Sequence, residues 1–102
     1  MASIYDLYVE QGSDFSESID MTGDYTGYTI RGSISDNSGV VTTGIVAWTD
    51  AALGQFDISL TNAETSALNS GVGKYDIEIE SATNVVSRIL KGRVYVDSEV
   101  TV

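Results

Sequence analysis

The stretch that decides the fold is FDISLTNAETSALNSGVGKYDIEIE, residues 56–80. Apolar residues occupy every second position in FDISL (56–60) and in YDIEIE (75–80), the pattern of β-strands that are buried on one face. The polar run between them begins with Thr61 and carries Glu64 three residues later, the spacing of a helix capping box. The stretch therefore predicts two strands joined by a short helical segment.

That segment is more easily explained as structure than as chemistry. Ala63, Ala67 and Leu68 supply a small apolar stripe for one or two helical turns, and glycines follow at 71 and 73. We expect the helix to close one end of the core with Leu68. A catalytic role for Glu64 would require a second tuned group, and the stretch does not contain one.

The same alternation continues along the rest of the chain. We expect further strands over residues 4–9, 14–20, 28–35, 40–48 and 88–96, with connections at 21–27, 36–39, 50–54 and near 83–84. About seven strands and one short helical turn predict an all-β, immunoglobulin-like β-sandwich that forms one domain over residues 1–102. The Cys…Trp…Cys signature of true immunoglobulin domains is missing, and a core position is favoured over an interface position for Trp48.

A turn centred on residues 83–84 would fix the register of the last hairpin. It would place Asp76 opposite Lys91, Lys74 opposite Arg93, and Ile77 opposite Leu90. Glu78 and Glu80 are then expected to be solvated, and the tail SEVTV, residues 98–102, has the composition to add a short edge strand.

The first strand is apolar on both faces. Tyr5, Leu7 and Val9 form one row, and Ile4 and Tyr8 form the other. One row would pack on the strand's own sheet. The second row either meets a neighbouring molecule, directly or by edge pairing, or is covered by the domain itself, and the pattern favours neither. All five residues are the candidate interface.

The composition limits which functions are possible. Fifteen acidic residues against five basic ones give a net charge of −10, which disfavours binding to nucleic acid and to anionic membranes. No apolar run approaches about 18 residues, as a membrane-spanning helix requires, and the first ten residues do not resemble a secretory signal. The chain has no cysteine and no histidine, so disulfides, thiolate metal sites and the commonest general base are excluded.

The remaining chemical options are weak. Carboxylates at Asp14, Glu17, Asp20 and Asp24 could form an acid–base pair, but this stretch is polar and has no evident apolar pocket to raise a pKa. The run Asp36–Gly39 is too short for a calcium loop, and GVGK, residues 71–74, lacks the spacing of a phosphate loop. We therefore expect a protein that is not an enzyme and has no cofactor or metal.

Four segments carry a family resemblance: QGSDF (11–15), TGYT (26–29), residues 60–78, and RILKGRV (88–94) followed by EVT (99–101). In these segments the chain resembles small virion proteins of tailed phages, of the cyanophage type, and the immunoglobulin-like N-terminal domain of phage baseplate upper proteins. Residues 36–54 depart from the family pattern.

The resemblance implies a virion structural protein, made in the host cytoplasm and assembled in many copies as a tail or baseplate component. Its partners would be other virion proteins, among which copies of the same chain are one option. Two alternatives remain: a capsid decoration (cement) protein, and a carbohydrate- or receptor-binding module. The latter would use an aromatic platform of Tyr5, Tyr8, Tyr25, Tyr28 and Trp48.

Overall fold

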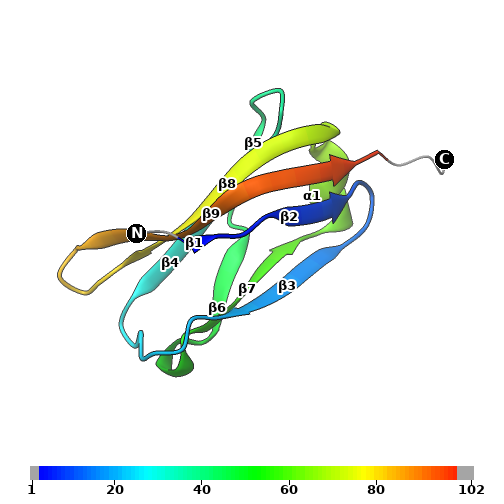
Figure 1. The fold of residues 1–102 in the computed structure, drawn as a ribbon. Helices are drawn as coiled ribbons and strands as arrows, with labels where there is room; N and C mark the ends of the chain where they lie inside the picture. The colour runs from blue at the N-terminus through cyan, green and yellow to red at the C-terminus, as the bar shows by residue number, and fades with distance from the viewer. Residues whose placement is uncertain (1–2, 99–102) are drawn as a thin grey trace.

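A computed structural model describes residues 3–98, in which the chain forms nine strands, one 3-10 turn and one α-helix (Figure 1). The elements are, in chain order, β1 (Ser3–Ile4), β2 (Leu7–Glu10), β3 (Phe15–Asp20), β4 (Thr29–Ser35), β5 (Val41–Thr43), β6 (Val46–Asp50), η1 (Ala51–Leu53), β7 (Gln55–Leu60), α1 (Asn62–Ala67), β8 (Gly71–Glu80) and β9 (Val86–Asp97). The end of the predicted edge strand at 98–102 and the EVT segment lie outside the described residues.

The strands form two stacked sheets (Figure 1). The larger sheet has the order β1–β9–β8–β4–β5, with β2 also paired to β9, and the smaller sheet has the order β3–β7–β6. Strands β3, β7 and β6 thus correspond to B, E and D of an immunoglobulin-like sandwich, and β4, β8 and β9 to C, F and G. The predicted all-β sandwich is confirmed. Strands β1 and β2 run parallel to β9, whereas the other pairs are antiparallel.

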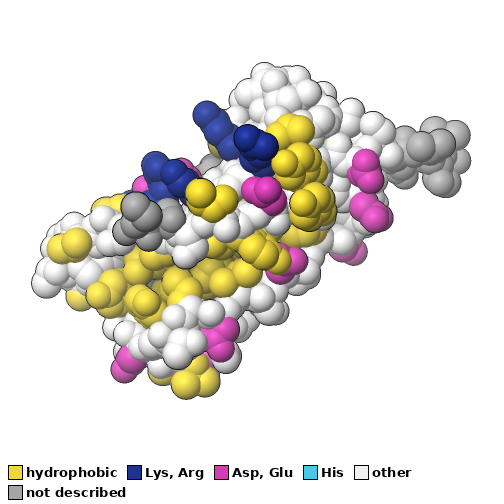
Figure 2. Space-filling view, viewed as in Figure 1, with side chains coloured by type: hydrophobic (Ala, Val, Ile, Leu, Met, Phe, Trp, Pro, Cys, Tyr) yellow, Lys and Arg dark blue, Asp and Glu magenta, His cyan; other side chains and the backbone are white. Residues whose placement is uncertain are grey.

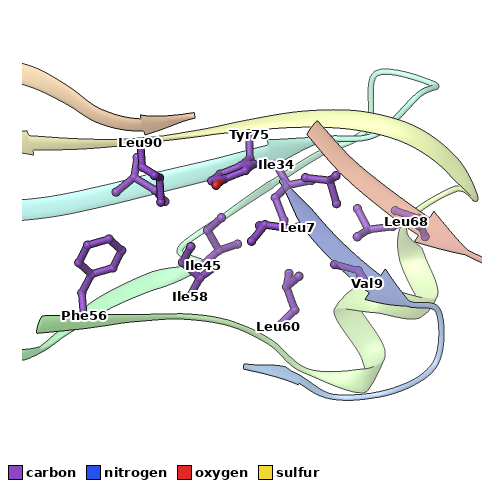
Figure 3. Packing of buried hydrophobic residues seen from close by; sticks show 13 residues of the cluster. Leu7, Val9, Ile34, Ile45, Phe56, Ile58, Leu60, Leu68, Tyr75 and Leu90 are labelled. Carbon is purple, nitrogen blue, oxygen red and sulfur yellow. The ribbon is translucent and has the colours of Figure 1, made fainter. Parts of the chain in front are cut away.

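The core lies between the two sheets (Figure 3). Because side chains alternate along each strand, every second residue of β2, β4, β7, β8 and β9 points into it. The labelled core side chains come from both sheets, from the link between β5 and β6, and from the residue after α1, and they include Leu7, Val9, Ile34, Ile45, Phe56, Ile58, Leu60, Leu68, Tyr75 and Leu90.

The predicted register of the last hairpin is correct. Strands β8 and β9 pair Asp76 with Lys91, Lys74 with Arg93, and Ile77 with Leu90. Asn84 adopts a left-handed conformation with φ 65° in the connecting turn, as asparagine does more readily than most residues.

The prediction of one strand over residues 40–48 is wrong. The segment divides into β5, in the larger sheet, and β6, in the smaller one. Gly44 has φ 71° between them, and Ile45 is buried in the core. The β-branched residues on both sides of Gly44 resemble one continuous strand, and their alternation does not reveal the positive φ of the glycine between them.

The first strand is also interrupted, at Tyr5 and Asp6. Here the chain crosses β9 at Gly92, where a Cβ atom would overlap the carbonyl oxygen of Tyr5. The glycine is therefore required by close approach of two backbones. The hydroxyl of Tyr75, from the neighbouring strand, donates a hydrogen bond to the same carbonyl.

Helix α1 begins with the predicted capping box. The Thr61 hydroxyl accepts from the backbone N–H of Glu64 at 3.2 Å, and the Glu64 carboxylate accepts from the N–H of Thr61 at 2.9 Å. Leu68 is buried as expected. The predicted alanine stripe is wrong, because both alanines are exposed and Thr65 is the helical residue that faces the core.

Candidate functional site

The structure separates the five candidate interface residues into two groups. Leu7 and Val9 are each 1% exposed and belong to the core, so they are not available to a partner. Ile4 and Tyr8 are 76% and 71% exposed and lie on the outer face of the larger sheet, and Tyr5 is 43% exposed. In the described part of the chain, the domain therefore covers one face of this segment and leaves the other open.

Hydrogen bonds to β9 hold the segment in place. The Tyr5 N–H donates to the Lys91 carbonyl at 2.9 Å, and the Arg93 N–H donates to the Asp6 carboxylate at 2.9 Å. Strand β2 then continues in register, with Tyr8 opposite Tyr95. The open face is thus a fixed surface of the sandwich, because the break in the strand is bridged by backbone and carboxylate contacts.

The outer face of the larger sheet carries an apolar row of Tyr8, Tyr95 and Val72, which are cross-strand neighbours. The rings of Tyr8 and Tyr95 stack with centroids 5.1 Å apart and an angle of 11° between their planes. Val72 and Tyr8 are both at least half exposed. An exposed aromatic and aliphatic row of this kind is typical of the centre of a protein interface.

Charged residues flank this row on both sides along the strands. Lys74 and Arg93, which are cross-strand partners, form a cationic row on one side. Glu10 and Asp97, which are also partners, form an acidic row on the other. Figure 2 shows this order on the visible face: basic side chains, then hydrophobic ones, then acidic ones toward the C-terminal end. We call these three rows together the banded face.

All five basic residues of the chain lie on the outer face of the larger sheet, on β4, β8 and β9: Arg31, Lys74, Arg88, Lys91 and Arg93. Two of them form ion pairs. Arg31 contacts Glu78 at 3.2 Å and Glu80 at 2.9 Å, and Arg88 contacts Asp76 at 3.3 Å.

The prediction that Glu78 and Glu80 are only solvated is therefore wrong, because the alternation did not indicate that Arg31 would lie on the adjacent strand. Lys74, Lys91 and Arg93 form no ion pair with any residue between 3 and 98. They line a shallow depression of about 510 Å³ together with Ile4 and Asp6.

The predicted aromatic platform is not brought together as one surface. Tyr25, Tyr28 and Trp48 form a separate group in which Tyr25 stacks on Trp48 at 5.8 Å and Trp48 packs edge-on against the core residue Phe56. The indole N–H of Trp48 donates to the Tyr28 carbonyl at 3.0 Å. Trp48 is half-buried against the core, as favoured.

A second depression, of about 520 Å³, opens between the two sheets. It is lined by apolar side chains of both sheets, among them Ile19, Met21, Phe56 and Ile89. It belongs to the open side of the sandwich, where β1 and β2 end one sheet and β3 ends the other.

The carboxylates considered for catalysis have local structural contacts. Asp14 accepts from the N–H of Asn62 at 2.7 Å, Asp20 from that of Thr22, and Asp24 from that of Thr26. Hydrogen bonds from Thr26 hold the pKa of Asp24 below its usual value. Thr22 itself has a left-handed backbone, with φ 53°.

Glu17 differs from these carboxylates. Its Oε2 atom is buried without a hydrogen-bond partner in the described residues. The neighbouring Glu17 carboxylate is the main cause that raises the pKa of Tyr5. Burial, followed by the charges of Asp6 and Glu17, raises the pKa of Tyr75. The phenols therefore stay neutral and can donate to oxygens on this side of the sandwich.

The sequence did not predict that two polar residues, Thr65 and Asp36, would be buried. The Thr65 hydroxyl donates to the Ser13 carbonyl at 2.8 Å and accepts from the Gly12 N–H at 3.1 Å, and Gln11 donates to the Leu68 carbonyl at 2.9 Å. These bonds join the β2–β3 turn to α1, so QGSDF and the helical segment form one clip. In the sequence, the only indication of this contact was that Thr65, a polar residue, lies within the predicted helix.

Asp36 is the other missed residue. It is only 5% exposed, and its carboxylate accepts hydrogen bonds from backbone N–H groups of Ser38, Val40 and Asn69 and from the Asn69 side chain, at 2.8–3.0 Å. These bonds, above all that from the Asn69 backbone, hold the pKa of Asp36 below its usual value. The carboxylate therefore ties the β4–β5 turn to the segment after α1.

Two further observations concern residues 3–98. They contain no group of three or more acidic, histidine or cysteine side chains placed to hold a metal ion. No helix among them is both long and apolar enough to cross a membrane.

The fold and the banded face define a class: an immunoglobulin-like β-sandwich with a fixed, exposed apolar row on its larger sheet. No protein-family model matches the chain, and no curated protein sequence matches it significantly. The phage resemblance thus remains an expectation from the four sequence segments.

Proposed function

We propose that the chain is a non-enzymatic structural protein of a phage virion, assembled in many copies as a tail or baseplate component. The observation that carries the proposal is the division of the first strand. Leu7 and Val9 anchor it in the core, while Ile4 and Tyr8 stand exposed on the outer side. A rigid sheet with an exposed aromatic row is suited to adhesion.

The clip between the β2–β3 turn and α1 supports this proposal in a second way. The QGSDF and TNAETSAL segments, which carry much of the resemblance, contact each other through Gln11, Gly12, Ser13 and Thr65. They fix the direction in which β2 leaves the sheet. The same sequence features that suggest the family therefore position the surface that we propose to meet virion proteins.

A capsid decoration protein would use the same surface. The tail or baseplate assignment and the capsid assignment therefore differ only in which virion protein this surface would contact. The carbohydrate-binding alternative has weaker support. Of its five aromatic residues, Tyr25, Tyr28 and Trp48 cluster in a group that packs partly on the core, and Tyr8 stacks instead with Tyr95.

The proposal is tested by particle fractionation from the natural source. Density-gradient particles should contain the protein at a fixed ratio to the major capsid protein. The double variant Ile4→Ser and Tyr8→Ser should fold but be lost from the particles, because it removes only exposed apolar surface. Ser59→Ala, on the outer face of the smaller sheet, is the control and should be retained. A protein found only in the free fraction would contradict the proposal.

If the protein is in particles, labelling with antibodies and electron microscopy separates the two locations. Label at the tail end supports the baseplate assignment. Label distributed over the capsid supports decoration.

A further inference from the structure

Strand β3 has a free edge. In the part of the chain that the structure describes, β3 pairs with β7 on one side and with no strand on the other. The backbone N–H and C=O groups along such an edge can pair with an added strand. The opposite edge of the same sheet is less suitable, because β6 has a register shift between Trp48 and Asp50, and irregular edges resist added strands. Strand addition to the smaller sheet is therefore expected at β3.

The free edge of β3 borders the second depression, the one between the two sheets. Its apolar lining includes Ile19, Met21, Phe56, Ile89 and Leu90. Ile19, Met21 and Ile89 are only half-buried. Because side chains alternate along a strand, every second residue of a strand added beside β3 would point into the opening between the sheets. Apolar side chains at those positions would cover this lining.

Glu17 places an acidic side chain on the same side of β3. It lies two residues before Ile19 and faces the same way, roughly 7 Å along the strand. Its Oε2 atom is buried without a hydrogen-bond partner among residues 3–98, while the side chain as a whole is half-buried. The neighbouring phenol of Tyr5 is neutral, so it does not compensate the charge of the carboxylate.

This carboxylate selects which strand can be added. An inward-facing charge on an edge strand prevents indiscriminate pairing, because an apolar strand would bury the charge unpaired. A strand whose own inward side chain is Lys or Arg avoids that cost by pairing with Glu17. The charges at the rim of the depression already have contacts: Arg88 pairs with Asp76 at 3.3 Å, and Asp20 accepts from the Thr22 N–H at 2.8 Å.

We propose that the open side of the sandwich binds an extended segment of another protein. The segment pairs with β3, places apolar side chains in the second depression and sets a Lys or Arg against Glu17. Main-chain hydrogen bonds supply the affinity in this mode of binding, and the inward side chains supply the specificity. The proposal goes beyond the proposed function, which concerns the outer face of the other sheet.

The charges of the chain show which partner fits. All five basic residues of the sequence lie on β4, β8 and β9, which are internal strands of the larger sheet and are not available for addition to β3. A second copy therefore cannot supply the required strand. The net charge of −10 attracts a basic segment of a different protein.

The test uses two peptides of defined sequence. Thr-Val-Thr-Lys-Thr-Val-Thr, with blocked ends, has the required alternation and a central lysine, and Thr-Val-Thr-Glu-Thr-Val-Thr is its charge-reversed counterpart. Each is titrated to about 1 mM into the isotope-labelled full chain, and amide NMR shifts locate the binding site. The lysine peptide should shift amides of β3 and of the residues lining the depression. The glutamate peptide should bind at least about tenfold more weakly, because like charges would meet at Glu17.

Exchanging the charge on the protein tests the same contact. Glu17→Lys should bind the glutamate peptide and lose at least about tenfold in affinity for the lysine peptide. Glu17→Gln, which is nearly isosteric, should lose the preference between the two peptides. Glu10→Lys is the matched control: it changes the net charge by the same amount as Glu17→Lys but lies on the outer face of the larger sheet, and it should keep the wild-type preference. Circular dichroism checks that each variant is folded.

Four results would each overturn the proposal. They are no binding of the lysine peptide at about 1 mM, equal binding of the two peptides by wild type, shifts away from β3 and the depression, and a loss in Glu10→Lys as large as that in Glu17→Lys. The wild-type comparison decides the matter even if a Glu17 variant does not fold. All of these measurements use the isolated chain, so they are independent of the particle fractionation that tests the proposed function.

Discussion

Replacing Thr65 by valine should weaken the clip between the β2–β3 turn and α1. Thr65 has no exposed surface, and its hydroxyl donates to the Ser13 carbonyl and accepts from the Gly12 N–H. Valine has nearly the same shape, but it leaves the half-buried Gly12 N–H and the Ser13 carbonyl without this partner. Each hydrogen bond contributes about 0.5–1.5 kcal/mol, so for the two bonds together we expect a loss of about 2 kcal/mol.

For a domain of this size, about 2 kcal/mol corresponds to a fall in Tm of about 8–16 °C. Thermal unfolding followed by circular dichroism measures the shift. Urea unfolding should show a lower midpoint with an unchanged slope, since the surface exposed on unfolding is the same. Thr65→Ser keeps the hydroxyl and should lose less, and Ser66→Ala, on the exposed side of α1, should change stability by less than about 0.5 kcal/mol. A Thr65→Val protein as stable as Ser66→Ala would refute the clip.

Three further predictions concern other parts of the fold. Gly92→Ala should destabilise the protein and increase protease cleavage before β2, because the new Cβ overlaps the Tyr5 carbonyl; unchanged cleavage and Tm would contradict the close approach. The pKa of Asp36 is lowered in the folded state, so its contribution to stability is complete above the carboxyl's unfolded pKa and is lost as pH falls through the folded one. Urea unfolding between pH 6 and pH 2, at about one-unit steps, should show a smaller acid loss for Asp36→Asn than for wild type, and equal losses would exclude this role. Arg31→Gln should cost less than about 1 kcal/mol in urea unfolding, because its ion pairs with Glu78 and Glu80 are solvent-exposed; a larger loss would mean that they matter more than their exposure indicates.

The sequence was most informative where alternation and a turn acted together. The register of β8 and β9 follows from residues 75–80, the turn at Asn84 and the strand that begins near Arg88. The capping box likewise depends on two residues three positions apart. Such signals are local, so neighbouring residues contain all the information required.

The errors arose where the structure depends on contacts between distant segments. The change of sheet at Gly44, the crossing at Gly92, and the partners of Thr65 involve chain segments that periodicity does not connect. The banded face was also missed as a whole. Its row of Tyr8 with Tyr95 appears only when β2 is known to lie parallel to β9.

The division of the five candidate interface residues into buried and exposed ones has the same explanation. Alternation divided Tyr5, Leu7 and Val9 from Ile4 and Tyr8, but it could not tell which row faced the core. That depends on β9, from which Val94 and Val96 enter the core beside Leu7 and Val9. The exposed row is thus defined by a partner strand more than 80 residues away in the sequence.

The central claim is that the outer face around Tyr8 is covered in the assembled state. Because the chain contains no cysteine, Tyr8→Cys introduces a single thiol whose labelling rate can be measured in the free protein and in purified particles. Ser59→Cys on the other sheet is the control. We predict rapid labelling of both variants in free protein and protection of the Tyr8→Cys thiol alone in particles. Equal labelling of that thiol in the two states would contradict the account.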